Sequence, residues 1–310
     1  MDNIMVFSGS SHPELAAEIC RYLGVPLSPT NRTRFSNDNL EVQLAESVRE
    51  HDVYIVQTFS PPVQEHLVEL LMMCDAARSA SARRVTAVVP YYSYARSDKK
   101  DKPRISIAGR LFADLMHTAG VSRLLTMTLH SPQVQGFFPM PADQLSGQPA
   151  LVQHFGVREL ANTVVVTPDI GNAKRASQLA RKLGVPLAAG NKHRISDDQV
   201  EIEDIVGNVG GKHAIVYDDE IASAGTIVAT IELLRKRGVT GVTIATEHGV
   251  FSGPAIERLR DLGVAEIITT NTVPIRPEKR LPNMRVLSVA PIFGEAIHRI
   301  NTGESVSAIF

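Results

Sequence analysis

The sequence of 310 residues contains only two cysteines, no long apolar run and almost no excess of charge of either sign. Cys20 and Cys74 lie far apart, without a neighbouring set of Cys or His ligands, so the sequence predicts neither a disulfide nor a structural zinc site. No stretch of 18 apolar residues occurs, and the first residues lack a basic segment followed by an apolar one. We therefore expect a cytoplasmic protein that does not bind a membrane.

A net charge of −1 provides no overall field that would attract nucleic acid or an anionic membrane. Any anion site must therefore be local. The composition, 44% hydrophobic and 21% charged, is that of an ordinary globular protein. A chain of this length exceeds the size at which one hydrophobic core keeps growing, which predicts two domains.

Short apolar runs rich in β-formers alternate with helix-period segments of ten or more residues. The runs lie at 4–7, 53–56, 85–89, 164–166, 214–217 and 242–245. This alternation is typical of βαβ units and predicts mostly parallel sheets with helices on their faces.

The two halves of the chain match each other at a constant shift of 160 positions. Residues 23–27 and 183–187 are both Leu-Gly-Val-Pro-Leu, and residues 31–43 align without a gap onto 191–203. A helix-end signal could arise twice independently, but the long gapless register favours an internal duplication.

The copies differ where chemistry is expected, because Thr58 and Phe59 stand at the positions of Asp218 and Asp219. We expect a domain boundary in the Gly- and Pro-containing stretch 139–149, which gives domains 1–145 and 146–310. The last helix, around 295–299, is a candidate to pack on the first domain.

The most specific motif spans residues 214–226. An apolar run leads into two acids, Asp218 and Asp219, and then into a turn of small residues before a helix: Ala222, Ser223, Ala224, Gly225 and Thr226. Such a turn lets backbone N–H groups approach a phosphate, and the two carboxylates can accept hydrogen bonds from a diol or face a metal. The alternative is a capped helix after an acidic turn.

Three weaker motifs accompany it. Asp169 and Gly171 follow a strand, which suits a pyrophosphate loop with Asp169 facing Mg²⁺ but equally an ordinary βα turn. His130 follows another apolar strand and is either a ligand or a structural histidine. The basic tract 96–104 is either a solvated loop or a mobile lid over a triphosphate.

Together these motifs resemble ribose-phosphate diphosphokinase, also called phosphoribosyl pyrophosphate synthetase, over nearly the whole chain. The stretches that carry the resemblance are 34–36 (RFS), 61–76 (PPVQEHLVELLMMCDA), 90–96 (PYYSYAR), 129–138 (LHSPQVQGFF) and 218–226 (DDEIASAGT). The resemblance implies two duplicated type I phosphoribosyltransferase-like domains. It also implies transfer of the β,γ-diphosphoryl group of ATP to C1 of ribose 5-phosphate, giving phosphoribosyl pyrophosphate and AMP, by a homo-oligomer, either a dimer or a hexamer.

The same resemblance assigns roles to individual residues. ATP binding falls to Phe35, Asn37, Glu41, Arg96 and Ser97. Ribose 5-phosphate binding falls to Asp218, Asp219, Ala222, Ser223, Ala224, Gly225 and Thr226. Lys192 and Arg194 match the catalytic Lys and Arg, and His130 and Asp169 match the Mg²⁺ side.

Three positions depart from the family pattern. Ala222 stands where the family commonly has an acid, Thr128 where it often has Asp, and Asn172 where it often has a second Gly. Two alternatives therefore stay open at this stage: a non-catalytic regulatory paralogue of the enzyme, or a phosphoribosyltransferase. The second leaves the N-terminal copy and its basic tract unexplained.

Overall fold

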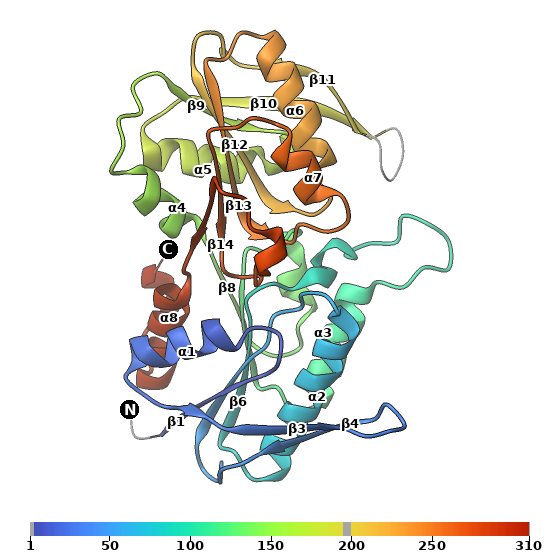
Figure 1. Cartoon of the computed structure of the whole chain (residues 1–310). Helices are drawn as coiled ribbons and strands as arrows, with labels where there is room; N and C mark the ends of the chain where they lie inside the picture. Colours follow the sequence, from blue (N-terminus) through green and yellow to red (C-terminus); the bar gives the residue numbers. More distant parts are fainter. Residues whose placement is uncertain (1–2, 195–199, 310) are drawn as a thin grey trace. The chain divides into compact units, whose positions relative to one another are not determined.

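The computed structural model describes the backbone of residues 3–194 and 200–309 and the side chains of residues 3–191 and 204–309. The chain divides into two compact units (Figure 1). The first unit comprises Met1–Ser146, Thr272–Pro274 and Ser288–Phe310, and the second comprises Gly147–Asn271 and Ile275–Leu287.

The first unit is built on a six-stranded parallel sheet of order β2-β1-β5-β6-β7-β8. Its strands are β1 (Ile4–Ser8), β2 (Leu27–Ser28), β5 (Asp52–Val56), β6 (Arg84–Val89), β7 (Arg123–Met127) and β8 (Ala142–Leu145). Helices α1 (Pro13–Leu23) and α8 (Ala290–Thr302) cover one face, and α2 (Val63–Ser79) and α3 (Ala108–Thr118) cover the other. The apolar side chains of the strands alternate between these two cores, as the period of a strand requires.

An antiparallel hairpin, β3 (Thr30–Arg34) and β4 (Leu40–Leu44), lies between β2 and β5 in the chain and forms a separate two-stranded sheet. Within the described residues, five short 3₁₀ helices complete the elements: η1 (Ser93–Arg96), η2 (Pro132–Phe137), η3 (Ile170–Asn172), η4 (Pro277–Lys279) and η5 (Val306–Ile309).

The second unit is built on a seven-stranded sheet of order β11-β10-β9-β12-β13-β14-β15, in which β11 is antiparallel to β10 and the other neighbours are parallel. Its strands are β9 (Thr163–Thr167), β10 (Leu187–Arg194), β11 (Val200–Val206), β12 (His213–Ile221), β13 (Gly241–Gly249), β14 (Glu266–Thr270) and β15 (Met284–Leu287). Helices α4 (Gln148–Phe155) and α5 (Ala173–Leu183) pack on one face, and α6 (Gly225–Lys236) and α7 (Ala255–Arg260) on the other.

The predicted duplication appears in the backbone itself. Helices α1 and α5 begin and end at residues 160 positions apart, and each ends on a glycine, Gly24 or Gly184, with φ 69° and ψ 27°. This left-handed conformation closes the helix at low cost only for glycine. The predicted class, two α/β copies with mostly parallel sheets flanked by helices, is confirmed.

Both cysteines are buried and free. Among the described residues, no helix is both long enough and apolar enough to cross a membrane.

Candidate active site

The proposed site residues of the second unit gather where β9, β12 and β13 end. These strands are parallel neighbours, so their carboxyl ends meet at one edge of the sheet. In open α/β sheets this edge is where ligands bind. Asp169 follows β9, while Asp218 and Asp219 lie near the end of β12.

The turn after β9 is organised by Asp169. Its Oδ1 accepts a hydrogen bond from the backbone N–H of Gly171 at 2.8 Å, which shapes the start of η3. Asn172 follows as the N-cap residue of α5, and its Nδ2 donates to Oδ1 of Asp218 at 3.4 Å. The turn after β9 thus lies directly beside the acids of β12.

The two acids of β12 have different surroundings. Strand β12 continues past them to Ile221, so Asp218 and Asp219 lie within the strand rather than after it. Asp219 is 3% exposed, and its Oδ2 pairs with Nη1 of Arg175 at 3.2 Å. Asp218 is only partly buried. We therefore expect Asp218 to be the more accessible of the two carboxylates.

The small-residue turn leads into α6 through an unusual backbone conformation. Ala224 is the N-cap residue of α6 and adopts φ 63° and ψ 4°, which residues other than glycine seldom occupy. No side chain among the described residues caps the helix, and Nη1 of Arg258 holds the carbonyl of Ser223 at 2.9 Å. A helix start whose first amides have no capping side chain suits an anion such as a phosphate.

Lys192 and Arg194 lie near the end of β10, which pairs with β11 and carries a β-bulge between Asn191 and Lys192. The basic sequence Asn-Lys-His-Arg has no strand signal of its own, so its strand conformation follows from pairing with β11. Their side chains lie outside the described part.

The residues assigned to ATP in the first unit are at the hairpin tip and in the basic tract. Phe35 is 47% exposed in the turn between β3 and β4, and Oδ1 of Asn37 accepts from the N–H of Asn39 at 3.3 Å. Glu41 is exposed on β4, opposite Thr33. The hairpin therefore presents an aromatic ring beside polar side chains.

Arg96 is the exposed last residue of η1. The hydroxyl of Ser97 accepts from the N–H of Ala108 at 3.0 Å and donates to the carbonyl of Ser106 at 3.3 Å, so it closes the base of the basic tract. His130 is exposed after the end of β7. These residues belong to the first unit, whereas Asp169 belongs to the second.

No group of three His, Cys, Asp or Glu side chains that could hold a metal occurs in the described residues. This finding is compatible with Mg²⁺, which often takes one or two carboxylates and completes its octahedron with water and substrate phosphates. The half-buried carboxylate of Asp169 at the sheet edge fits the role of such a single protein ligand.

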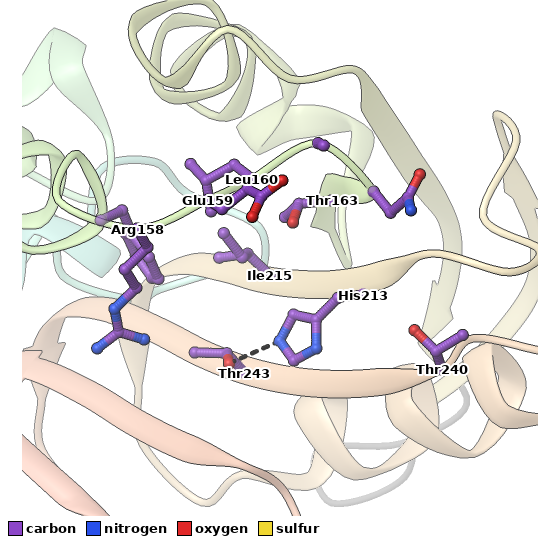
Figure 2. A pocket seen from close by; sticks show the side chains of 11 residues that line it. Arg158, Glu159, Leu160, Thr163, His213, Ile215, Thr240 and Thr243 are labelled. Atoms are coloured by element: carbon purple, nitrogen blue, oxygen red, sulfur yellow. Dashed lines mark hydrogen bonds between the residues drawn. The ribbon is translucent and has the colours of Figure 1, made fainter.

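A cavity of about 430 Å³ lies at the opposite edge of the second sheet, where β9, β12 and β13 begin (Figure 2). Figure 2 shows His213 in its lining, with Nε2 hydrogen-bonded to Oγ1 of Thr243 at 2.8 Å. Burial, and next the charge of Arg158, lowers the pKa of His213 below its ordinary value. This cavity is separate from the proposed site, which lies at the other ends of the same strands.

Comparison with known proteins places this geometry in a family. Residues 4–120 match the N-terminal domain of ribose phosphate pyrophosphokinase, and residues 193–310 match the phosphoribosyl synthetase-associated domain. The chain is 53% identical to the ribose-phosphate pyrophosphokinase of Deinococcus radiodurans, over 99% of this chain and 98% of the relative. The corresponding protein of Clostridium acetobutylicum is 47% identical over 99% of this chain and 97% of the relative.

The chain belongs to the ribose-phosphate pyrophosphokinase family. The crystal structure of phosphoribosylpyrophosphate synthetase from Mycobacterium smegmatis agrees, with a TM-score of 0.90 and 40% identity over 97% of this chain and 99% of that chain. The resemblance identified from the sequence is thereby confirmed at the level of the family. The individual residue roles remain predictions.

Sequence reasoning missed Arg175. The residue stands six positions after Asp169, but the sequence analysis assigns no role to it. The structure shows its guanidinium on the buried carboxylate of Asp219. The available signal was the need of a buried acid for a cationic partner, which the sequence alone could not place.

Proposed function

We propose that the protein is a Mg²⁺-dependent ribose-phosphate diphosphokinase that transfers the β,γ-diphosphoryl group of ATP to C1 of ribose 5-phosphate. The observation that carries this proposal is the sheet edge of the second unit. There, the acids of β12 precede a helix start that no described side chain caps, in a chain that is similar to a ribose-phosphate pyrophosphokinase over 99% of its length.

The second unit is the proposed sugar-phosphate site. The amides of Ala224, Gly225 and Thr226 and the hydroxyls of Ser223 and Thr226 bind the 5-phosphate, because donors around a helix start complement its charge. Asp218 accepts hydrogen bonds from the ribose hydroxyls. Asp219 positions the guanidinium of Arg175 at this sheet edge through their ion pair.

The first unit is the proposed ATP site. Phe35 stacks on adenine, while Asn37 and Glu41 contact its polar edge. Arg96 binds phosphate oxygens, and Ser97 holds the base of the basic tract. We further propose that His130 in the first unit and, separately, Asp169 in the second unit are ligands of Mg²⁺, which would neutralise phosphate charge when bound.

In the transfer, the C1 hydroxyl oxygen bonds to the β-phosphorus, the bond from that phosphorus to the α-bridging oxygen breaks, and AMP leaves with that oxygen. The hydroxyl proton passes to solvent or to a nearby base. Lys192 and Arg194 stabilise the charge that develops on the transferring group, which is the main catalytic contribution in phosphoryl transfer. A cytoplasmic location and a dimeric or hexameric assembly also remain predictions.

A ³¹P NMR experiment with ATP, Mg²⁺ and ribose 5-phosphate tests the reaction. We expect new diphosphate resonances of a C1-linked pyrophosphate, together with AMP in equal amount. A non-catalytic paralogue would leave the ATP resonances unchanged. A phosphoribosyltransferase would consume added phosphoribosyl pyrophosphate in the presence of a base but would not form it.

A further inference from the structure

Glu69 of α2 is a fully buried carboxylate to which the proposed reaction gives no role. Its Oε1 accepts from the N–H of Ser10 at 3.0 Å and pairs with Nε of Arg32 at 2.9 Å. Its Oε2 accepts from the Ser10 hydroxyl and from Nε2 of Gln57 at 2.7 Å. Burying a carboxylate is costly unless it is paired and hydrogen-bonded, and these donors meet that need.

A second ion pair lies one helical turn away. Glu65 of α2 pairs with Nη2 of Arg34 at 2.5 Å, and Nη1 of Arg34 also holds Asp38 of the hairpin tip at 2.6 Å. Glu65 and Glu69 share one face of α2, and Arg32 and Arg34 share one face of β3. The pairs Arg32–Glu69 and Arg34–Glu65 therefore form a two-step ladder between α2 and the hairpin.

The ladder holds β3 on α2, whereas apolar packing holds β4 on the core. In β4, Val42 and Leu44 pack against the core on the α2 side of the first sheet. The register places Arg32 opposite Val42, so β3 presents charge on the face where β4 presents apolar side chains. Figure 1 shows the hairpin as a narrow arm formed by β3 and β4. Its orientation thus depends on the ladder along one of its two strands.

We propose that Glu65 and Glu69 are positioning residues for ATP. Through the ladder they hold the β3–β4 hairpin, and with it Phe35 and Asn37, in the orientation that accepts adenine. This inference rests on the proposed function of the hairpin. If ATP binds only when the ladder holds the hairpin in this orientation, breaking either ion pair lowers the fraction of protein that can bind ATP. The apparent dissociation constant for ATP then rises.

The exposed step gives the cleanest test, because Arg34 and Glu65 are 45% and 36% exposed and tolerate substitution. We would measure KM for ATP, KM for ribose 5-phosphate and kcat for Arg34→Glu, Glu65→Arg and the double exchange. Each single variant should raise KM for ATP roughly fivefold, with the other two constants within about twofold. The double exchange should restore most of the loss. Asp75→Asn, which breaks the pair with Arg78 on the same helix, is the matched control.

The buried step is tested on ligand-free protein by amide hydrogen exchange of residues 30–44. Glu69→Gln should speed exchange across the hairpin while leaving β1 and β5 protected. Single variants with an unchanged KM for ATP, or a double exchange as impaired as the singles, would overturn the proposal. Faster exchange with unchanged equilibrium binding of ATP would overturn it as well. If the unmodified protein formed no product, the proposed function would fail instead, and the exchange data would still test the ladder.

Discussion

The two units share a fold, but the positions at which the second is proposed to bind a sugar phosphate are part of the core in the first. Thr58 and Phe59 correspond to Asp218 and Asp219, and both are fully buried. The hydroxyl of Thr58 donates to the carbonyl of Thr272 at 2.7 Å. The ring of Phe59 packs on Tyr92 with centroids 5.4 Å apart. At the positions where the second unit carries two carboxylates, the first unit therefore carries side chains that pack in its core.

The cationic positions differ in a related way. Arg32 and Arg34 correspond to Lys192 and Arg194 at the shift of 160, and the first pair is neutralised by Glu69 and Glu65. The positions of α6 that correspond to these acids carry Ala229 and Gly225. The comparison teaches that acids of α2 neutralise the cationic strand in the first copy, whereas the two corresponding positions of α6 carry no acid. We infer that the second copy keeps its cations for phosphate.

The largest expected effect concerns the cationic pairs. Lys192→Ala and Arg194→Ala should each lower kcat by roughly 10²-fold or more, because a cation that acts in the transition state is lost. Arg34→Ala, the counterpart of Arg194→Ala, should leave kcat nearly unchanged and raise KM for ATP. Steady-state kinetics checks this division. Equal losses of kcat in Arg194→Ala and Arg34→Ala would contradict the proposed difference between the two units.

A smaller effect is expected at the phosphate turn. Thr226→Val should weaken ribose 5-phosphate binding roughly tenfold, the value of a hydrogen bond to a charged group, while ATP binding persists. Ser60→Ala is the matched control in the first unit, because its buried hydroxyl has no hydrogen-bond partner within the described part of the chain. Titration calorimetry with each ligand measures both. Parallel weakening of both ligands would indicate a folding defect instead.

In the first unit, a substitution at Thr58, the position equivalent to Asp218, should lower the stability of the protein rather than weaken ribose 5-phosphate binding. Thr58→Val removes a hydroxyl that donates to Thr272 and accepts from the N–H of Tyr91. We expect a loss of about 2 kcal/mol of unfolding free energy, because two buried hydrogen bonds are removed. Chemical denaturation monitors the loss, and KM for ribose 5-phosphate should not change. A change in that KM would place a sugar site in the first unit after all.

The smallest effect concerns pH. Because the pKa of His213 is lowered in the folded protein, the neutral ring contributes stability that is complete above its unfolded pKa. That contribution is lost as pH falls from the unfolded pKa through the folded one. The corresponding residue of the first unit is Val53. His213→Val should flatten the dependence of unfolding free energy on pH just below neutrality. A curve of unchanged slope would show that His213 does not contribute.

Much of the fold was predictable because its signals are local and repeated. The alternation of apolar runs and the match between 23–27 and 183–187 predicted two copies of a parallel α/β unit. The partners of buried charges were not predictable, since Arg175 meets Asp219 and Arg32 meets Glu69 across 44 and 37 positions of the chain. Such pairs are fixed by tertiary contact, for which a single sequence has no periodic signal.

The same reasoning applies to the backbone at Lys192. Polar residues in a paired strand lack the apolar alternation by which strands are recognised, so the sequence did not indicate that β10 extends to Arg194. The turn of small residues before α6 was easier to locate, because a run of small residues after two acids is specific in sequence.

The central claim is that only the second unit binds ribose 5-phosphate, and counting the sites tests it directly. Titration calorimetry of the whole protein, with a non-hydrolysable ATP analogue present, should give one ribose 5-phosphate per chain. That site should disappear in the double variant Asp218→Ala with Asp219→Ala, while the ATP analogue still binds. Two equivalent sites per chain, or one that survives the loss of both acids, would contradict the account.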